Sequence, residues 1–227
     1  MNLITAEIRE KNLQNIKDSI LPTTKIMAVT KTLSHKAIES AIKHKIYLIG
    51  ENRIQETEEK IKMLDPENRK KIKLHLIGNL QTNKIKKAID IYDVIETVYR
   101  EKQLVKINKH AFEKNKVQKI YIQVNIGKDI KKQGVFSQKL NSFMQKAQNM
   151  KNVSITGLMT ILPNPIEEKK KKQYYKNMLI LFNKIKKEYS GCTNLSMGMS
   201  GDYHLASQEG STQIRIGTFL YGKRKNT

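Results

Sequence analysis

The chain of 227 residues has one cysteine, no long apolar run and few acidic groups, and each scarcity excludes a class of protein. Its single cysteine, Cys192, cannot form an internal disulfide, which is typical of a protein that acts in a reducing, cytoplasmic compartment. No run of about 18 apolar residues occurs, so we expect no membrane-spanning helix. The charged N-terminal segment has no apolar h-region, so we expect no signal peptide.

Acidic residues are half as frequent as basic ones, at 21 against 43, which gives a net charge of +22. Taken alone, this excess suggests a nucleic-acid partner. However, 37 of the basic residues are lysine and only 6 are arginine, the residue that base readout and bidentate phosphate contacts favour. The lysines are also scattered, and the densest run, 169–172, is typical of the solvated start of a helix. We therefore interpret the charge as compositional bias and keep nucleic-acid binding as an alternative.

Short apolar runs alternate with amphipathic stretches along the whole chain. The predicted strands span 26–29, 47–50, 74–78, 92–98, 117–126, 153–159, 195–197 and 213–216. A helix is predicted over 3–20, and others follow the strands at 34–45, 53–64, 81–89, 100–114, 137–149, 166–189 and 202–208. Pro66 is expected to help to end the helix over 53–64.

Eight β-then-α units without a long linker predict parallel strands with helical crossovers. We expect a single α/β domain over residues 1–227, folded as a (β/α)8 TIM barrel, although the chain is short for that fold. The alternative is an open doubly wound sheet. That fold usually carries a Gly-rich turn after its first strand, whereas here Thr30, Lys31 and Thr32 follow.

Functional groups of a parallel barrel gather where its strands end. Lys31 ends the first strand, and SMGMSGD (196–202) and RIGT (215–218) follow the last two. Barrels often bind phosphate in these last two loops, because glycines let backbone N–H groups approach closely and hydroxyls add donors. The alternative is two ordinary glycine-containing turns.

An amine and a phosphate site across one barrel mouth suit an aldehyde cofactor that bears a phosphate, of which pyridoxal 5′-phosphate is the common example. Lysine forms an imine with its aldehyde. Arg215, between Ile214 and Ile216, is the expected partner of the pyridine nitrogen, and a permanently protonated guanidinium would make the ring a weaker electron sink. The alternative for Arg215 is a surface ion pair.

Seven separated segments, in order, resemble the pyridoxal phosphate homeostasis proteins, whose fold is similar to the N-terminal barrel of bacterial alanine racemase. They are AVTKT (28–32), GENRIQE (50–56), HLIGNLQTNK (75–84), VNIGKDIKKQG (124–134), GLMTILP (157–163), SMGMSGD (196–202) and STQIRIGTFLYG (211–222). The sequence departs from the family at Thr30, where serine is usual, at Leu33, where lysine is common, and at His204, where glutamate is usual.

The resemblance implies a role for each of eight residues. Lys31 would carry the Schiff base, and Arg215 would lie near the ring nitrogen. The phosphate would be held by Ser200, Gly217 and Thr218, and the pocket would be lined by Asn52, His75 and Met159. A strand-end asparagine or histidine is as often a structural hydrogen-bond partner, so that alternative stays open for Asn52 and His75.

The resemblance implies a cytoplasmic protein that stores, delivers or buffers pyridoxal 5′-phosphate, with no committed reaction, no metal and no catalytic residue. We expect a monomer with pyridoxal-phosphate-dependent apo-enzymes as candidate partners. The main alternative is an amino-acid racemase. In alanine racemase, the family comparison implies that a second domain supplies the second base, and this chain ends soon after Gly222.

Overall fold

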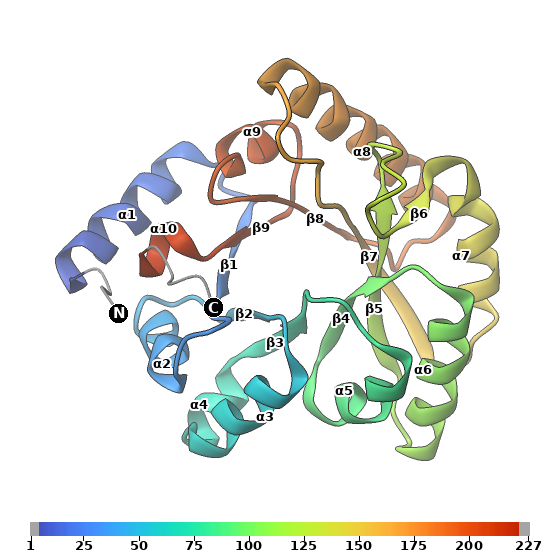
Figure 1. Ribbon diagram of the computed structural model, residues 1–227, viewed down its shortest axis with the longest axis horizontal. Helices are drawn as coiled ribbons and strands as arrows, with labels where there is room; N and C mark the ends of the chain where they lie inside the picture. The colour runs from blue at the N-terminus through green and yellow to red at the C-terminus, as the bar shows by residue number, and fades with distance from the viewer. Residues whose placement is uncertain (1–4, 223–227) are drawn as a thin grey trace.

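The strands of the protein form a closed parallel barrel (Figure 1). The structure, a computed structural model, describes residues 5–222, and in that range the strands are β1 (Lys25–Val29), β2 (Leu48–Glu51), β3 (Lys73–Leu76), β4 (Val94–Val98), β5 (Gln118–Asn125), β6 (Val135–Phe136), β7 (Val153–Met159), β8 (Asn194–Met199) and β9 (Gln213–Ile216). They pair in the order β1-β2-β3-β4-β5-β7-β8-β9, and β9 pairs back with β1. The predicted eight-stranded barrel is therefore confirmed over the open sheet.

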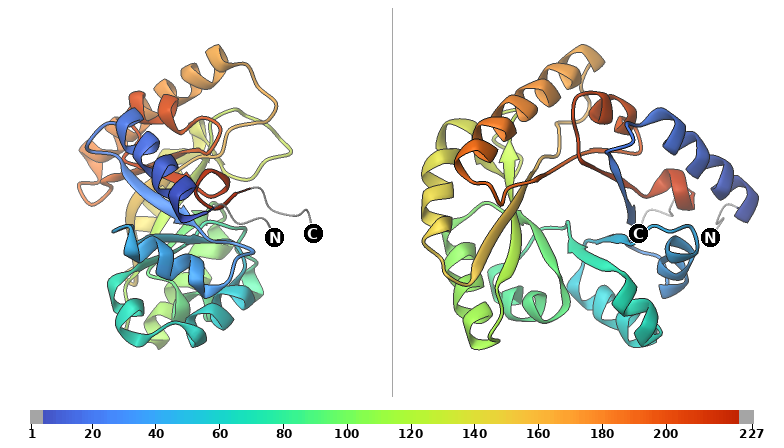
Figure 2. Two further views of the ribbon diagram at one scale, coloured as in Figure 1. Left: turned by 90° about the vertical axis from the view of Figure 1, so that its left-hand side faces the viewer. Right: turned by 180° about the vertical axis from the view of Figure 1, so that it is seen from behind.

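Helices surround this barrel on the outside, as the front and back views show (Figures 1 and 2). They are α1 (Ala6–Ser19), α2 (His35–Lys43), α3 (Ile54–Met63), α4 (Pro66–Lys71), α5 (Ile85–Ile91), α6 (Glu101–Glu113), α7 (Leu140–Gln148), α8 (Glu168–Glu188), α9 (Tyr203–Gln208) and α10 (Thr218–Tyr221), with single 3-10 turns η1 (Thr82–Lys84) and η2 (Ser137–Lys139). Within the described residues, none of these helices combines the length and the apolar character that crossing a membrane requires.

Side chains alternate along each strand between the helical layer and the barrel interior. The main core lies between strands and helices: in α8, for example, Tyr175, Met178, Phe182 and Ile185 recur at helical spacing and are buried. A second cluster inside the barrel joins Val94, Tyr121 and Met159. Burial on both faces explains why the strands appear in the sequence as nearly continuous apolar runs.

Three elements were not predicted, and each has a local cause. Pro66, which we expected to help to end a helix, begins α4, because a proline at the first helical position forgoes an N–H that would have no partner there. The carboxylate of Asp65 caps α4 by accepting the N–H groups of Glu67 and Asn68, at 2.8 and 3.3 Å. The two-residue β6 and the four-residue α10 are too short to show a period.

The first helix packs against the last one. Figures 1 and 2 show α1 and α10 side by side, and Arg9 Nε and Asn12 Nδ2 donate to the carbonyl oxygens of Leu220 and Phe219, at 3.3 and 2.8 Å. The loop between β9 and α10 is thereby held in place, and this loop contributes to the site described next.

Candidate functional site

A cavity of about 310 Å³ opens at the carboxyl ends of the strands, where a parallel barrel concentrates functional groups. Its lining comes from the ends of β1, β2, β3, β7, β8 and β9 and consists of Val29, Lys31, Asn52, Ile77, Ile161, Met199, Ser200, Gly201, Arg215, Gly217 and Thr218. The structure therefore brings together six of the eight residues predicted for the site, namely Lys31, Asn52, Ser200, Arg215, Gly217 and Thr218.

Lys31 reaches this cavity because it continues the alternation of β1. Val29 lines the cavity, and Met27, two residues earlier, is fully buried. The sulfur of Met27 lies 2.6 Å from the position that a Cβ atom on Gly50 would take. The residue between Val29 and Lys31, Thr30, is fully buried and hydrogen-bonded to Glu51, at 2.6 Å. One residue later, Thr32 has a positive φ of 62° and turns the chain away from the strand direction.

A buried ionic network holds the segment around Lys31. The Nζ of Lys60 donates to the carbonyl oxygen of Thr30 at 2.7 Å and to the carboxylates of Glu51 and Glu56 at 2.6 Å each. Glu56 also accepts the backbone N–H of Thr32. Burial raises the pKa of Glu51, and the charge and hydrogen bond of Lys60 oppose that rise.

This network was not predicted from the sequence. The segment GENRIQE drew attention to Asn52, whereas its two carboxylates, Glu51 and Glu56, bracket the segment that carries Lys31. The signal that was available is the spacing of Glu56 and Lys60, four residues apart on one helix, which favours an ion pair. Nothing local in the sequence shows that this pair lies behind β1.

The loops after β8 and β9 meet at the cavity beside the end of β1, because β9 pairs with β1. The N–H of Gly217 donates to the hydroxyl of Ser200 at 3.3 Å, so the two loops are tied together. Gly198 has a φ of 93°, in the region that favours glycine, and a side chain there would begin 2.5 Å from the Cβ of Ala206. The close packing of β8 on α9 thus fixes where Ser200 stands.

Arg215 lies inside the barrel rather than in a surface ion pair, with only 4% of its surface exposed. Its guanidinium donates to the hydroxyl of Ser196 and to the carbonyl oxygen of Thr160, both at 2.7 Å. Burial lowers the pKa of Arg215, and the charge of Glu96 opposes that change. Two of its five N–H donors are held by these oxygens, and the group still lines the cavity.

The side chain of Asn52 has a hydrogen-bond acceptor without a donor. It lines the cavity, and its Oδ1 is buried without a hydrogen-bond partner. A buried acceptor without a partner is costly, so such an atom indicates a missing donor. A ligand that carries a hydroxyl or a protonated nitrogen would supply that donor.

His75 and Met159 lie elsewhere in the barrel. The Nδ1 of His75 is 2.6 Å from a carboxylate oxygen of Glu96, and the ring meets that of Tyr121 edge-on with centroids 5.9 Å apart. His75 lines a different cavity, at the amino ends of the strands. Met159 is fully buried against Val94 and Tyr121. The structure does not bring either residue to the cavity that contains Lys31.

The chain matches the family model of the alanine racemase N-terminal domain over residues 5–225. The pyridoxal phosphate homeostasis protein of Aquifex aeolicus is 34% identical over 88% of this chain and 87% of that protein. The protein of the same name from Synechocystis sp. is 36% identical over 89% of this chain and 93% of that protein. The chain belongs to the pyridoxal phosphate homeostasis protein family.

Solved structures agree with this placement in the homeostasis protein family. PipY of Synechococcus elongatus PCC7942, determined without PLP, superposes with a TM-score of 0.87 at 30% identity, over 95% of this chain and all of PipY. The PLP-bound form of PipY gives a TM-score of 0.83. An alanine racemase of Clostridium difficile 630 shares the fold at a TM-score of 0.81 and 15% identity, and this chain spans 58% of it.

Proposed function

We propose that this homeostasis-family protein binds pyridoxal 5′-phosphate in the cavity at the carboxyl ends of the strands and stores, buffers or delivers it without a committed reaction. The observation that carries the proposal is the convergence of Lys31, Arg215 and the Ser200 and Gly217–Thr218 loops on one cavity of about 310 Å³. That volume is near the lower end of small-molecule sites, about 300–1,000 Å³. The PLP-bound form of PipY supports the choice of ligand.

When bound, the cofactor would supply an aldehyde, and we assign to Lys31 the amine that would hold it as a Schiff base, with loss of water. The Ser200 hydroxyl and the Thr218 side chain and N–H are the proposed phosphate donors, and Gly217 leaves room for the phosphate. Arg215 would offer a remaining N–H donor to the ring nitrogen. Asn52 Oδ1 would accept a hydrogen bond from the cofactor. His75 and Met159 are omitted from this set because neither lines the cavity.

The cavity supports a carrier better than a racemase. Racemisation needs a base on each face of a planar carbanion. Among the described residues that line the cavity, Lys31 is the single candidate base, since Arg215 stays protonated and the rest are aliphatic, amide, hydroxyl, thioether or glycine residues. We expect a chiral assay of the cofactor-loaded protein with L-alanine to show no racemisation above that of free pyridoxal phosphate.

Borohydride trapping tests the site. The purified protein, incubated with pyridoxal 5′-phosphate and reduced with borohydride, should gain the mass of one reduced cofactor, and peptide mapping should place it on Lys31. The unreduced complex should absorb in the near-ultraviolet to visible range. We expect the Lys31→Ala variant to lose both signals.

The matched control is Lys36→Ala, which removes an exposed lysine of α2 and should leave the labelling unchanged. Equal labelling of the Lys31→Ala and wild-type proteins would show that another amine is used and would reject the assignment.

We also propose that residues 1–227 act as one cytoplasmic domain and as a monomer that passes the cofactor to apo-enzymes. Light scattering at micromolar protein concentration tests the monomer. Transfer from the loaded protein to an apo-enzyme, measured as recovered activity and compared with free cofactor, tests delivery.

A further inference from the structure

A second polar cavity, of about 490 Å³, lies at the amino ends of the strands, at the opposite end of the barrel from Lys31. Residues at the starts of several strands line it, among them Lys25 and Lys73, the first residues of β1 and β3, and Lys119, the second residue of β5. We call these three residues the lysine ring. Asn194, the first residue of β8, lies at the same level of the barrel wall.

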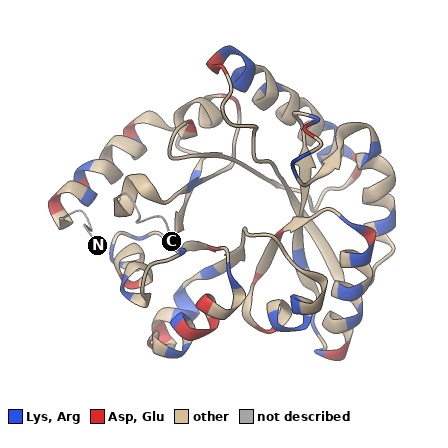
Figure 3. Cartoon of the chain, viewed as in Figure 1, with Lys and Arg blue, Asp and Glu red and all other residues tan. Residues whose placement is uncertain are grey.

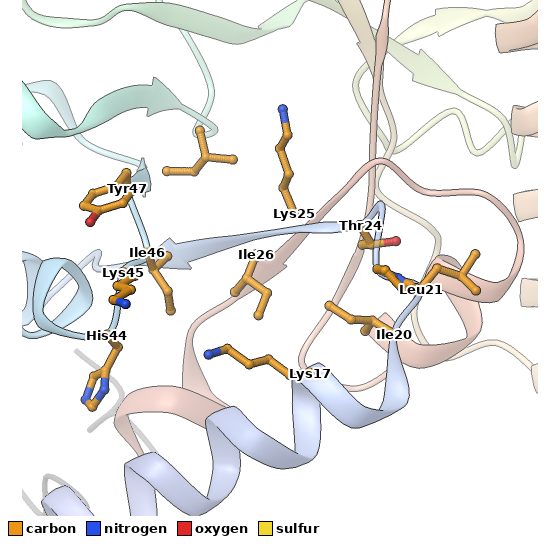
Figure 4. Close-up of a pocket in the computed structure, with 12 residues that line it drawn as sticks. Lys17, Ile20, Leu21, Thr24, Lys25, Ile26, His44, Lys45, Ile46 and Tyr47 are labelled. Atoms are coloured by element: carbon orange, nitrogen blue, oxygen red, sulfur yellow. The ribbon is translucent and has the colours of Figure 1, made fainter.

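The alternation of the strands directs the lysine ring inward. Each lysine lies two residues before a buried side chain, namely Met27, His75 or Tyr121, and residues two apart share a face. Layers of inward side chains from alternate strands fill barrels of this kind, and β1, β3, β5 and β8 are alternate strands of the closed ring. Figure 4 shows Lys25 on the opposite side of β1 from Ile26.

Positive charge in this cavity is not neutralised within the protein. Among residues 5–222, no ion pair or hydrogen bond involves the side chain of any of the three ring lysines, which are all exposed. The acidic residue that lines the cavity, Asp93, is already engaged: one of its oxygens accepts the N–H of Leu74 at 2.8 Å and pairs with Arg69 at 3.3 Å.

A fourth lysine adds positive charge to the cavity, but its ammonium group is not available to a ligand. Lys116 also lines the cavity, but its Nζ donates to the carbonyl oxygens of Ile89 and Tyr92, at 2.7 and 3.0 Å. Burial lowers the pKa of Lys116, and Asp93 opposes this. Neutral polar residues complete the wall, namely Thr156, Thr193, Asn194 and Gln213. The side chains of Thr156, Asn194 and Gln213 already donate hydrogen bonds within the protein, so the contacts to a ligand fall to the lysine ring.

We propose that the lysine ring binds a small anion of the polyphosphate class, either free or as the triphosphate of a nucleotide. Three ammonium groups around one cavity repel one another when it is empty, and a ligand of several negative charges removes that repulsion and accepts their hydrogen bonds. Lysine binds phosphate as a mobile point charge and does not need the fixed geometry of an arginine fork. The cavity volume of about 490 Å³ is that of a small-molecule site, which favours a small ligand over a nucleic-acid strand.

Calorimetric titration of the full chain with inorganic tripolyphosphate, in about 0.15 M salt to screen non-specific charge effects, tests the proposal. Before the titration, the protein is incubated with pyridoxal 5′-phosphate and treated with borohydride. The cofactor is then fixed in the cavity at the carboxyl ends of the strands and blocks it. Each single Lys→Gln change in the ring should weaken binding roughly tenfold, the equivalent of about 1.4 kcal/mol per charge-assisted contact, and the triple variant K25Q/K73Q/K119Q should abolish measurable binding.

The matched control is K169Q/K170Q/K176Q, which removes the same charge from exposed positions of α8 and should bind as the wild type does. Circular dichroism and thermal unfolding show whether each variant is folded, and the single variants serve if the triple variant is not. Equal binding by wild-type and ring variants, or equal losses in ring and control variants, would overturn the proposal.

Nucleoside triphosphate and a single-stranded oligonucleotide are titrated in parallel. Tighter binding of the nucleotide than of tripolyphosphate identifies a nucleotide ligand, and the reverse order identifies free polyphosphate. Oligonucleotide binding that depends on the ring and exceeds both would show a nucleic-acid surface and would overturn the small-anion proposal.

Discussion

At the scale of single residues, one buried ammonium organises the strand end that carries Lys31. Lys60 is 4% exposed and donates to Glu51, to Glu56 and to the carbonyl oxygen of Thr30. Removing one partner of a buried ion pair leaves the other charge without compensation. The network therefore matters for stability and for the position of Lys31 alike.

The first prediction concerns this ammonium. We expect Lys60→Met to lower the free energy of unfolding by about 3–5 kcal/mol, because Glu51 stays buried without its cation. Urea unfolding at pH 7 measures the change. Lys62→Met, an exposed position of the same helix, is the control and should change stability by no more than about 0.5 kcal/mol. Similar values for the two variants would show that the network contributes nothing.

The second prediction concerns Glu96, whose carboxylate lies inside the barrel. Burial alone would raise its pKa, but the hydrogen bond and charge of His75 and the charge of Arg215 hold the pKa below the usual 4.5. An acid with a lowered folded-state pKa adds stability above its unfolded pKa and loses it as the pH falls through the folded value. This part of the stability should therefore be lost below about pH 4.5.

Glu96→Gln tests that contribution. The variant should be less stable at pH 7 by about 3–5 kcal/mol, because the buried guanidinium of Arg215 loses a nearby negative charge. It should also lose less stability than the wild type between pH 4.5 and pH 3.5. Urea midpoints across this range give both quantities, and parallel pH profiles for the two proteins would contradict the assignment.

At the scale of elements, the packing of β8 on α9 depends on one glycine. Gly198 has a φ of 93°, and a side chain there would begin 2.5 Å from the Cβ of Ala206. We expect Gly198→Ala to lower the free energy of unfolding by more than about 1 kcal/mol and to weaken cofactor binding, because Ser200 directly follows β8. Gly201→Ala is the control for stability, since nothing lies within 4 Å of the added group.

Urea unfolding measures the stability of both glycine variants, and cofactor absorbance measures their binding. A Gly198→Ala protein as stable as the wild type would mean that the β8–α9 contact relaxes without cost. A loss of binding with unchanged stability would place the effect in the loop rather than in the packing.

The elements also show what the sequence could predict. Every barrel strand was found because burial on both faces leaves a mainly apolar run, as in β1, where Met27, Ala28 and Val29 are all buried. The start of α4 was not predicted because a proline is found both after the end of a helix and at the first position of a helix. The N-cap hydrogen bond of Asp65 shows that Pro66 begins α4. The place of Lys31 at the carboxyl end of the barrel was predictable because it lies two residues beyond the last residue of β1.

The sequence did not predict in which layer of the barrel interior an inward-facing side chain lies. His75 belongs to a four-residue strand, and its place as the third residue, facing inward, puts it in the layer of Tyr121 and away from Lys31. Motifs in the sequence show that a residue is near a strand end but not in which layer its side chain lies. The sequence also does not show which residue of another element completes a hydrogen-bond network. An example is Lys60 of α3, which donates to the carbonyl oxygen of Thr30 after β1.

At the scale of the whole molecule, the net charge of +22 should act mainly through self-repulsion. Figure 3 shows basic residues on helices all around the barrel and no single basic face in that view. Charges distributed in this way repel one another in the compact state, and added salt screens them over about 30 Å at 0.01 M and about 8 Å at 0.15 M.

Stability should therefore rise with salt over that range. We expect the urea midpoint of the wild type to increase between about 0.01 and 0.15 M sodium chloride, where screening dominates over general salt effects on burial. The control triple variant of α8, with three fewer positive charges, should show a smaller increase. A midpoint that falls or stays flat would mean that local pairs such as Lys114–Asp90, at 2.7 Å, outweigh the long-range repulsion, because salt weakens such exposed pairs.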